Sequence, residues 1–274
     1  MAVPATNNNP HNTSNIVAFK SKRQTQSLQR YLIAAERAQG ADRSASLSWI
    51  ISAISSASKS IAAQLRSAGL NDALGASGTV NVQGETQQAL DVIADELLIE
   101  ELKSREGVVV LGSEENEELL VIADADASDK RYAVLFDPLD GSANLYVGGS
   151  VGTIFSIYEV ADGEELLLQA CRRQVAAGYV LYGPSTIFVL TLGQGVDMFV
   201  LEPSVGNFLR VGEPLRIPSR GRCYSVNEAN ADSFPQGYQA FLKSCRERGY
   251  ASRYAGAMVA DVHRVLLQGG VFMY

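Results

Sequence analysis

The sequence has few of the residues that form disulfides or bind a structural metal ion. It has three cysteines and two histidines in 274 residues. Because Cys171, Cys223 and Cys245 form no closely spaced pair, we expect neither a disulfide framework nor a structural zinc site. Free or buried thiols in a reducing compartment are the expectation, and a cytoplasmic or plastid location fits it. No apolar run approaches the roughly 18 residues of a membrane span, and no apolar signal-peptide core is present.

Positive charge is also scarce. There are 23 lysines and arginines against 30 aspartates and glutamates, which gives a formal net charge of −7. No long basic block interrupts this acidity, so we expect no nucleic-acid partner and no membrane partner. An acidic chain can still handle an anionic substrate if cations stand between that substrate and its carboxylates.

The composition is otherwise that of a folded protein. Hydrophobic residues make up 46% and charged residues 19% of the chain, which excludes a disordered protein and allows one large domain or two medium ones. Residues 1–22 are rich in Asn, Ser and Thr and are predicted to be a disordered tail. A remnant of an organelle-targeting segment is the alternative for this stretch.

Apolar spacing predicts helices first, then short strands, then a closing helix, which is typical of a layered α/β fold. Between the second and third helices, the small and Gly-rich residues 70–85 predict a mobile loop. The predicted helices cover 25–39, 45–67, 87–103 and 258–268. The predicted strands cover 108–111, 119–122, 132–136, 151–158, 176–182, 186–192 and 198–201, with a hairpin at 193–195.

One acidic segment carries most of the functional signal, Asp137-Pro138-Leu139-Asp140-Gly141-Ser142. The preceding apolar strand delivers Asp137 to its end, and Pro138 and Gly141 are expected to turn the chain sharply. Two carboxylates on one side of such a turn repel each other unless a cation lies between them. The amides of Gly141 and Ser142 could hold a phosphate oxygen. Together these groups predict phosphate-ester hydrolysis.

Other acidic residues could join this site. Glu114 and Glu115 follow a neighbouring strand, and adjacent strand ends can bring their loops together. Glu85 precedes a helix, and Asp91 lies in its first turn, where an acid also stabilises the helix dipole. His263 could pass for a metal ligand, but its place on an amphipathic helix favours a structural role.

The segment 137–142 resembles the signature of the lithium-sensitive phosphatase superfamily. Residues 25–274 more broadly resemble fructose-1,6-bisphosphatases, in order and at compatible spacing. The matching stretches are 80–85, 90–92, 113–115, 137–142, 152–155, 157–158, 176–179, 224–228, 253–254, 259–264 and 269–270.

The resemblance implies a role for each matching residue. Metal ligands for two or three Mg²⁺ ions, or Mn²⁺, would be Glu114, Glu115, Asp137, Asp140 and the carbonyl of Leu139. The catalytic residues would be Asp91 and Glu115, which position and deprotonate the attacking water, and Glu85, an acidic loop residue that relays a proton and helps to place the metal. Substrate-binding residues would be Gly141, Ser142, Asn227, Arg253, Tyr254, Met258 and Tyr274, with Arg253 reaching in from a neighbouring subunit.

The resemblance also implies alternating α-β-α-β-α layers. It suggests a metal-bearing domain over 23–206 and an incomplete substrate-binding domain over 207–274. The implied reaction is hydrolysis of the 1-phosphate of fructose 1,6-bisphosphate, in gluconeogenesis or the photosynthetic carbon cycle, by a homotetramer. Two alternatives stay open: a truncated chain that is inactive or depends on partners, and an inositol-monophosphatase-like enzyme.

The sequence departs from the family at four places. After Ser142, it has Ala143 where relatives have Ser, and Tyr146 where they have Asp. Position 230 is Asn rather than a phosphate-binding Tyr. The segment that holds a regulatory cysteine insertion in plastid relatives is short here and contains only Cys171. Relatives also continue beyond Tyr274 with a further Glu ligand and a Lys, so a C-terminally truncated chain is expected.

Overall fold

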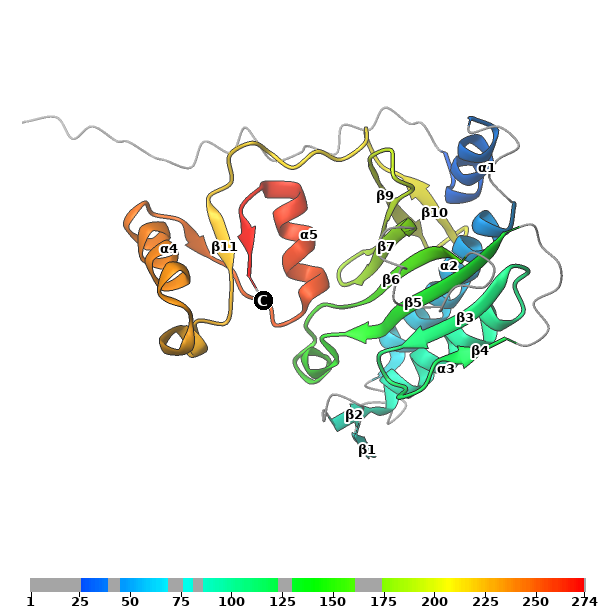
Figure 1. Cartoon of the computed structure of the whole chain (residues 1–274), viewed down its shortest axis with the longest axis horizontal. Coiled ribbons are helices and arrows are strands. Elements are labelled where there is room, and N and C mark those ends of the chain that lie inside the picture. Colours follow the sequence, from blue (N-terminus) through cyan, green and yellow to red (C-terminus); the bar gives the residue numbers. More distant parts are fainter. Residues whose placement is uncertain are drawn as a thin grey trace, which may run out of the picture.

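The computed structural model describes residues 26–38, 45–68, 76–80, 86–122, 130–160 and 174–273 (Figure 1). The predicted tail, 1–22, lies outside these residues, and so do Glu85, Cys171 and Tyr274. The two cysteines within them, Cys223 and Cys245, are buried free thiols, as expected.

Three helices form the first layer, against one face of a large sheet (Figure 1). The middle helix buries small and apolar side chains at intervals of three and four residues, such as Ile50, Ile54, Ala57 and Ile61. That spacing places them on one face, which packs against the third helix and the sheet. The helices are α1 (Leu28–Ala38), α2 (Ala45–Ser67) and α3 (Ala89–Lys103).

The large sheet has eight strands in the order β10-β9-β8-β7-β6-β5-β3-β4. Its neighbours pair antiparallel, except for β3 and β5, which run parallel. The predicted hairpin at 193–195 joins β8 to β9. The strands are β3 (Val108–Ser113), β4 (Leu120–Val121), β5 (Arg131–Asp140), β6 (Val151–Val160), β7 (Gln174–Tyr182), β8 (Thr186–Thr191), β9 (Val196–Glu202) and β10 (Asn207–Arg210).

A second, smaller sheet belongs to the last third of the chain. Its order is β12-β11-β13, and both of its pairings are parallel. Two further helices accompany it (Figure 1). These elements are β11 (Cys223–Ser225), α4 (Gln236–Glu247), β12 (Ala251–Ser252), α5 (Met258–Gln268) and β13 (Val271–Phe272).

Helix α5 lies between the two sheets and joins them. It contacts β6 and β7 on one side and β11 and β13 on the other. Its close approach to the large sheet depends on Gly152, because a Cβ there would come within 2.7 Å of Val259 Cγ1. Helix α4 covers the far side of the small sheet, where Leu242 packs near Tyr224. The layers therefore alternate α-β-α-β-α, which confirms the predicted fold.

The prediction of a loop over 70–85 was wrong in part. Residues within it form β1 (Ala76–Val80), which pairs antiparallel with β2 (Thr86–Gln88). Strands this short, built from small and polar residues, leave no apolar alternation to read. Strand β10 was also missed. None of the described helices is long and apolar enough to span a membrane.

Candidate active site

The segment predicted to carry the chemistry lies in an irregular part of β5. We expected the strand to end before Asp137, but it continues to Asp140. Asp137 pairs with Ile154 and Asp140 with Gly152, so two residues of β5 face one residue of β6. This is a β-bulge. In a regular strand, residues three apart point to opposite faces. With one extra residue between them, Asp137 and Asp140 point to the same face of the sheet, because their partners, Ile154 and Gly152, are two residues apart in β6.

The second acidic cluster lies beside the first. Strand β3 runs parallel to β5, with Ser113 opposite Phe136. The Glu114 amide donates a hydrogen bond to the Phe136 carbonyl at 3.0 Å, and the Glu115 amide donates to Ser113 Oγ at 3.2 Å. The carboxyl ends of the two strands therefore meet, as the sequence predicted. Asp91, in the first turn of α3, is only 2% exposed, and α3 packs against both strands.

The carboxylates of this site influence one another. Burial, followed by the charges of Glu114 and Asp140, raises the pKa of Asp137 to about 9. Burial also raises the pKa of Asp140, although hydrogen bonds from backbone amides oppose the shift. A divalent cation would allow the three groups to ionise together, and carboxylate oxygens are the donors that a hard metal ion prefers.

The expected ligands nevertheless do not form one compact cluster. Among the residues that the structure describes, no three His, Cys, Asp or Glu side chains are grouped so that they could hold a metal ion. Asp137 interacts with Glu114 and with Asp140, while Glu85 lies outside the described residues. The full ligand set therefore stays a prediction.

Asp140 also connects the acidic site to α5. Its Oδ1 accepts a hydrogen bond from the Met258 amide at 3.2 Å, and its Oδ2 accepts one from the Val259 amide at 2.7 Å. The capping position itself, Ala257, provides no side-chain hydrogen bond. Asp140 thus satisfies two amides at the start of this helix, where a negative charge is favourable. It also places Met258, a predicted sugar contact, next to the acidic site.

The Gly141 and Ser142 amides, predicted to hold the reacting phosphate and called the phosphate cradle below, lie at the start of a short 3-10 helix, η3 (Ser142–Val147). Gly141 precedes it with φ of 75°, in the left-handed region that favours glycine. A Cβ on Gly141 would press against the Cβ of Ala257. Asn144 then donates to the Ser150 carbonyl at 3.2 Å and to the Ala255 carbonyl at 3.0 Å. The cradle is therefore fastened to the loop before α5.

The predicted distal-phosphate residues lie at one edge of the small sheet. Asn227 follows β11, and Arg253 and Tyr254 follow β12. Because the strands are parallel, their carboxyl ends meet at the same edge. Asn227 caps the 3-10 helix η5 (Glu228–Ser233) by accepting from the Ala229 amide at 3.1 Å. Tyr274, which follows β13, lies outside the described residues.

Two charged residues of α5 fix the loop that carries Arg253 and Tyr254. Asp261 is fully buried and accepts a hydrogen bond from the Ala255 amide at 3.0 Å. Arg264 pairs with Asp261 at 2.6 Å and donates to the Arg253 carbonyl at 3.1 Å. The Arg253 side chain is exposed and donates to the Ser252 carbonyl at 2.8 Å. Sequence reasoning gave no role to Asp261 or Arg264, although both lie within a matching motif.

His263 has the structural role that its helix position indicated. Its Nδ1 lies 2.9 Å from the Tyr179 hydroxyl on β7, and the two rings meet edge to face. Burial, followed by the charge of Arg264, lowers its pKa to about 4. A neutral histidine buried between a helix and a sheet is a packing residue with one satisfied polar contact.

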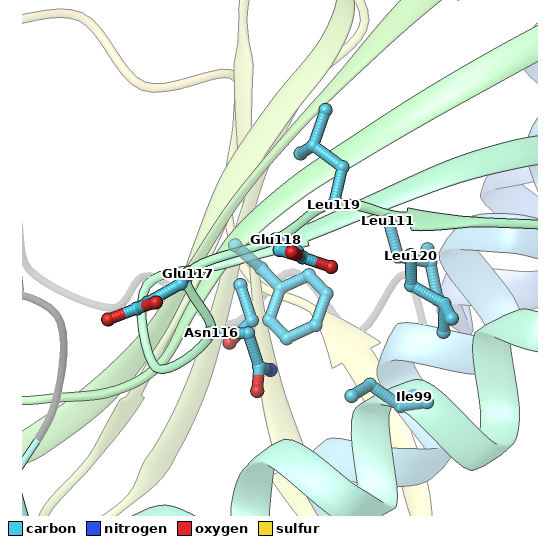
Figure 2. A pocket seen from close by; sticks show the side chains of 9 residues that line it. Ile99, Leu111, Asn116, Glu117, Glu118, Leu119 and Leu120 are labelled. Carbon is cyan, nitrogen blue, oxygen red and sulfur yellow. The ribbon is translucent and has the colours of Figure 1, made fainter.

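A cavity of about 400 Å³ opens between α3 and the loop that follows β3. Figure 2 shows Ile99 on the helix side, with Glu117 and Glu118 on the loop. None of the predicted substrate or metal residues that the structure describes lines the cavity, but Ser113, Asn116 and Phe136 do, and they are chain neighbours of Glu114, Glu115 and Asp137, so the cavity borders the acidic site. Its lining residues are Ile99, Leu111, Ser113, Asn116, Glu117, Glu118, Leu119, Leu120 and Phe136.

Comparison with known proteins agrees with this arrangement. Residues 26–213 match the fructose-1-6-bisphosphatase N-terminal domain, and residues 217–274 match its C-terminal domain. The chain is 46% identical over 249 residues to a class 1 fructose-1,6-bisphosphatase of Persephonella marina, covering 90% of this chain and 77% of the relative.

Solved structures of Leishmania major fructose-1,6-bisphosphatase share the fold. The holo form has a TM-score of 0.81 at 33% identity, and the apo form has 0.76 at 30% identity. Each comparison covers 91% of this chain and 78% of the other. The chain therefore belongs to the fructose-1,6-bisphosphatase family.

Proposed function

We propose that this chain hydrolyses the 1-phosphate of fructose 1,6-bisphosphate to give fructose 6-phosphate and phosphate. The observation that carries the proposal is the β5 bulge, which turns Asp137 and Asp140 to one face beside Glu114. Family membership supplies the substrate class. The loop with Arg253 and Tyr254, which Asn144 connects to the Gly141 turn through the Ala255 carbonyl, would contribute to a second subsite that binds an anion.

The residues suited to holding divalent cations are Glu114, Glu115, Asp137, Asp140 and the Leu139 carbonyl. Two or three Mg²⁺ ions, or Mn²⁺, would screen the phosphate charge, lower the pKa of a bound water and stabilise the departing alkoxide. The raised pKa of Asp137 supports this, because it shows that the ionised carboxylates repel each other and are stabilised when a proton or a metal cation binds between them.

The protein's own groups would handle the proton and the phosphate. Asp91 and Glu115, with Glu85, would orient the attacking water and accept its proton. The water oxygen then bonds to phosphorus while the bond from phosphorus to the sugar oxygen breaks, and that oxygen takes up a proton. The amides of Gly141 and Ser142 would donate to the phosphate oxygens, because the first amides of a helical turn have no partner within it.

The distal 6-phosphate would bind at the edge of the small sheet. Arg253 can grip a phosphate through two parallel hydrogen bonds, and Asn227, Tyr254 and Tyr274 add neutral donors. The Arg253 side chain is exposed, so it could serve the site of an adjoining subunit in a homotetramer. Met258 would contact the sugar between the two phosphates.

The test is phosphate release from fructose 1,6-bisphosphate by the purified chain, with the product identified by phosphorus NMR. We expect fructose 6-phosphate as the product and little hydrolysis of inositol monophosphate. Arg253→Ala should raise KM for the bisphosphate more than it lowers kcat. Lys243→Ala, which removes an exposed cation on α4, is the matched control and should have no effect.

Two results would overturn the proposal. Preferential hydrolysis of inositol monophosphate would assign the chain to the other branch of the superfamily. No release from either substrate with Mg²⁺ or Mn²⁺ would favour the partner-dependent alternative.

A further inference from the structure

The bulge in β5 has one residue opposite it, Thr153 of β6. Asp137 pairs with Ile154 and Asp140 with Gly152, so Pro138 and Leu139 share Thr153 as their counterpart. Proline has no amide hydrogen and cannot complete the ladder. The Thr153 hydroxyl instead donates to the Pro138 carbonyl at 2.8 Å. The peptide between the two acidic residues is thus held by a side chain rather than by strand pairing.

The Thr153 hydroxyl is itself fixed. It lies 2.9 Å from the Tyr182 hydroxyl at the end of β7. Because threonine has one hydroxyl hydrogen and Pro138 receives it, Tyr182 must be the donor in the second contact. Thr153 is fully buried and Tyr182 is 5% exposed, so water does not compete. Burial raises the pKa of Tyr182 to about 12, which keeps it protonated.

A third hydroxyl extends this arrangement to the helical layer. Ser58 of α2 hydrogen-bonds to Tyr182. Because the Tyr182 hydrogen points to Thr153, Ser58 must donate in this contact, which replaces its alternative bond to the Ile54 carbonyl, 2.6 Å away. Ser58 is also fully buried. Three buried hydroxyls therefore connect α2, β7 and β6 to the bulge. Valine and phenylalanine at positions 153 and 182 would fill the same space without requiring hydrogen-bond partners, so packing alone does not need these hydroxyls.

We propose that Thr153 is a positioning residue, whose hydroxyl, held by Tyr182, fixes the Pro138 carbonyl and so sets the spacing and direction of the Asp137 and Asp140 carboxylates. The proposal rests on the proposed function, in which those carboxylates bind the divalent cations. Loss of the hydroxyl would leave the Pro138 carbonyl without this donor and release the bulge. Asp140 would stay fixed by the Met258 and Val259 amides, so Asp137 would shift relative to it while both carboxylates remained present.

A structural role alone would affect stability, whereas a positioning role also affects metal binding. Thr153→Val removes the hydroxyl and keeps the shape, while Thr153→Ser keeps the hydroxyl. Tyr182→Phe removes the supporting donor. The matched control is Ile157→Val, which removes one methylene from a fully buried position of the same strand, far along β6 from the bulge.

The main readout is Mn²⁺ binding to the unliganded chain, measured by electron paramagnetic resonance and calorimetry, with thermal unfolding in parallel. Loss of a residue that orients a metal ligand typically weakens binding about 10-fold or more. We expect that loss for Thr153→Val and a smaller one for Tyr182→Phe. Thr153→Ser should bind close to wild type, and Ile157→Val should bind normally even where its unfolding temperature falls. In turnover, Thr153→Val should lower kcat and leave KM for the bisphosphate nearly unchanged.

The outcomes separate this proposal from the proposed function. Wild-type Mn²⁺ affinity and kcat in Thr153→Val would overturn the positioning role while leaving the hydrolase function intact. Equal losses of Mn²⁺ affinity in Thr153→Val and Ile157→Val would reduce Thr153 to a stabilising residue. A wild-type chain that binds Mn²⁺ but hydrolyses no bisphosphate would overturn the function alone, and the binding comparison would still decide the role of Thr153. A wild-type chain that binds no Mn²⁺ would overturn both.

Discussion

At the scale of single residues, Gly141 is a position in the candidate site with little freedom to vary. It combines φ of 75° with a close approach to Ala257. The first feature disfavours any residue with a Cβ, and the second leaves no space for one. Its neighbour in the same loop, Gly148, has φ of 66° but nothing within 4 Å of an added Cβ. Comparing substitutions at Gly141 and Gly148 therefore separates the cost of a left-handed backbone from the cost of a steric clash.

Gly141→Ala should destabilise the protein more than Gly148→Ala. The strain of a left-handed alanine is about 1–2 kcal/mol and applies to both variants. Only Gly141→Ala also pushes the start of α5 away from the bulge, so it should additionally lower phosphate release. Urea unfolding and turnover of the two variants measure this difference. Equal effects on stability and activity would show that the contact with Ala257 does not constrain the site.

His263 predicts a pH dependence of stability. Its folded pKa of about 4 lies below the ordinary value of 6.5. The unfolded chain therefore binds the proton more readily, and the stability contributed by neutral His263 should decline as pH falls from about 6.5 to about 4. A shift of this size corresponds to roughly 3 kcal/mol.

His263→Gln removes this titration and keeps a polar contact for Tyr179. The free energy of unfolding of the variant should therefore fall less steeply than that of wild type between pH 6.5 and pH 4. Because the same carboxylates titrate in both proteins, their contribution drops out of the difference between the two free energies of unfolding. Parallel curves would mean that His263 is protonated as easily in the fold as outside it.

At the scale of elements, α1 is attached to the large sheet by a buried charge. Asp197 of β9 is 6% exposed and accepts hydrogen bonds from the Tyr31 hydroxyl at 2.7 Å and from Arg210 Nε at 2.8 Å. The Arg210 guanidinium also lies over the Tyr31 ring. One carboxylate therefore links α1 to two adjacent strands.

Asp197→Ala should destabilise the protein by about 3 kcal/mol, because it leaves Arg210 without its partner in a site that is largely out of water. Protection against hydrogen exchange should fall first in α1. Asp232→Ala, in the exposed η5, is the control and should change stability by less than about 0.5 kcal/mol. Unchanged protection in α1 would show that other contacts hold this helix.

The elements differ in how far the sequence predicted them. Helices α2 and α5 have the predicted bounds because their apolar residues recur regularly over many turns. Strands β1, β2 and β10 were missed because short or polar strands carry almost no pattern. The β5 bulge was also missed, since a register shift depends on the partner strand. The Asp-Pro-Leu-Asp spacing contained an indirect signal, because two acids three apart can share one face only if the strand is irregular.

At the scale of the whole molecule, the candidate site forms where the two halves of the chain meet. Asp140 from the large sheet caps α5, and Asn144 holds the loop that carries Arg253. The acidic residues were predictable because their motif is local. The connections made by Asp261 and Arg264 were not, because they depend on how the loop before α5 folds back onto the helix, and that of Thr153 was not, because it joins two strands.

The most direct test of the site compares Asp137→Asn with Asp232→Asn in phosphate release from fructose 1,6-bisphosphate across a Mg²⁺ titration. Asp137→Asn preserves the shape of a proposed metal ligand and removes its charge, so kcat should fall by at least about 100-fold. Asp232→Asn should match wild type, and a chelator should abolish release by both wild type and this control. Turnover that survives in Asp137→Asn, or that continues in excess chelator, would contradict a metal-dependent hydrolase built on the β5 bulge.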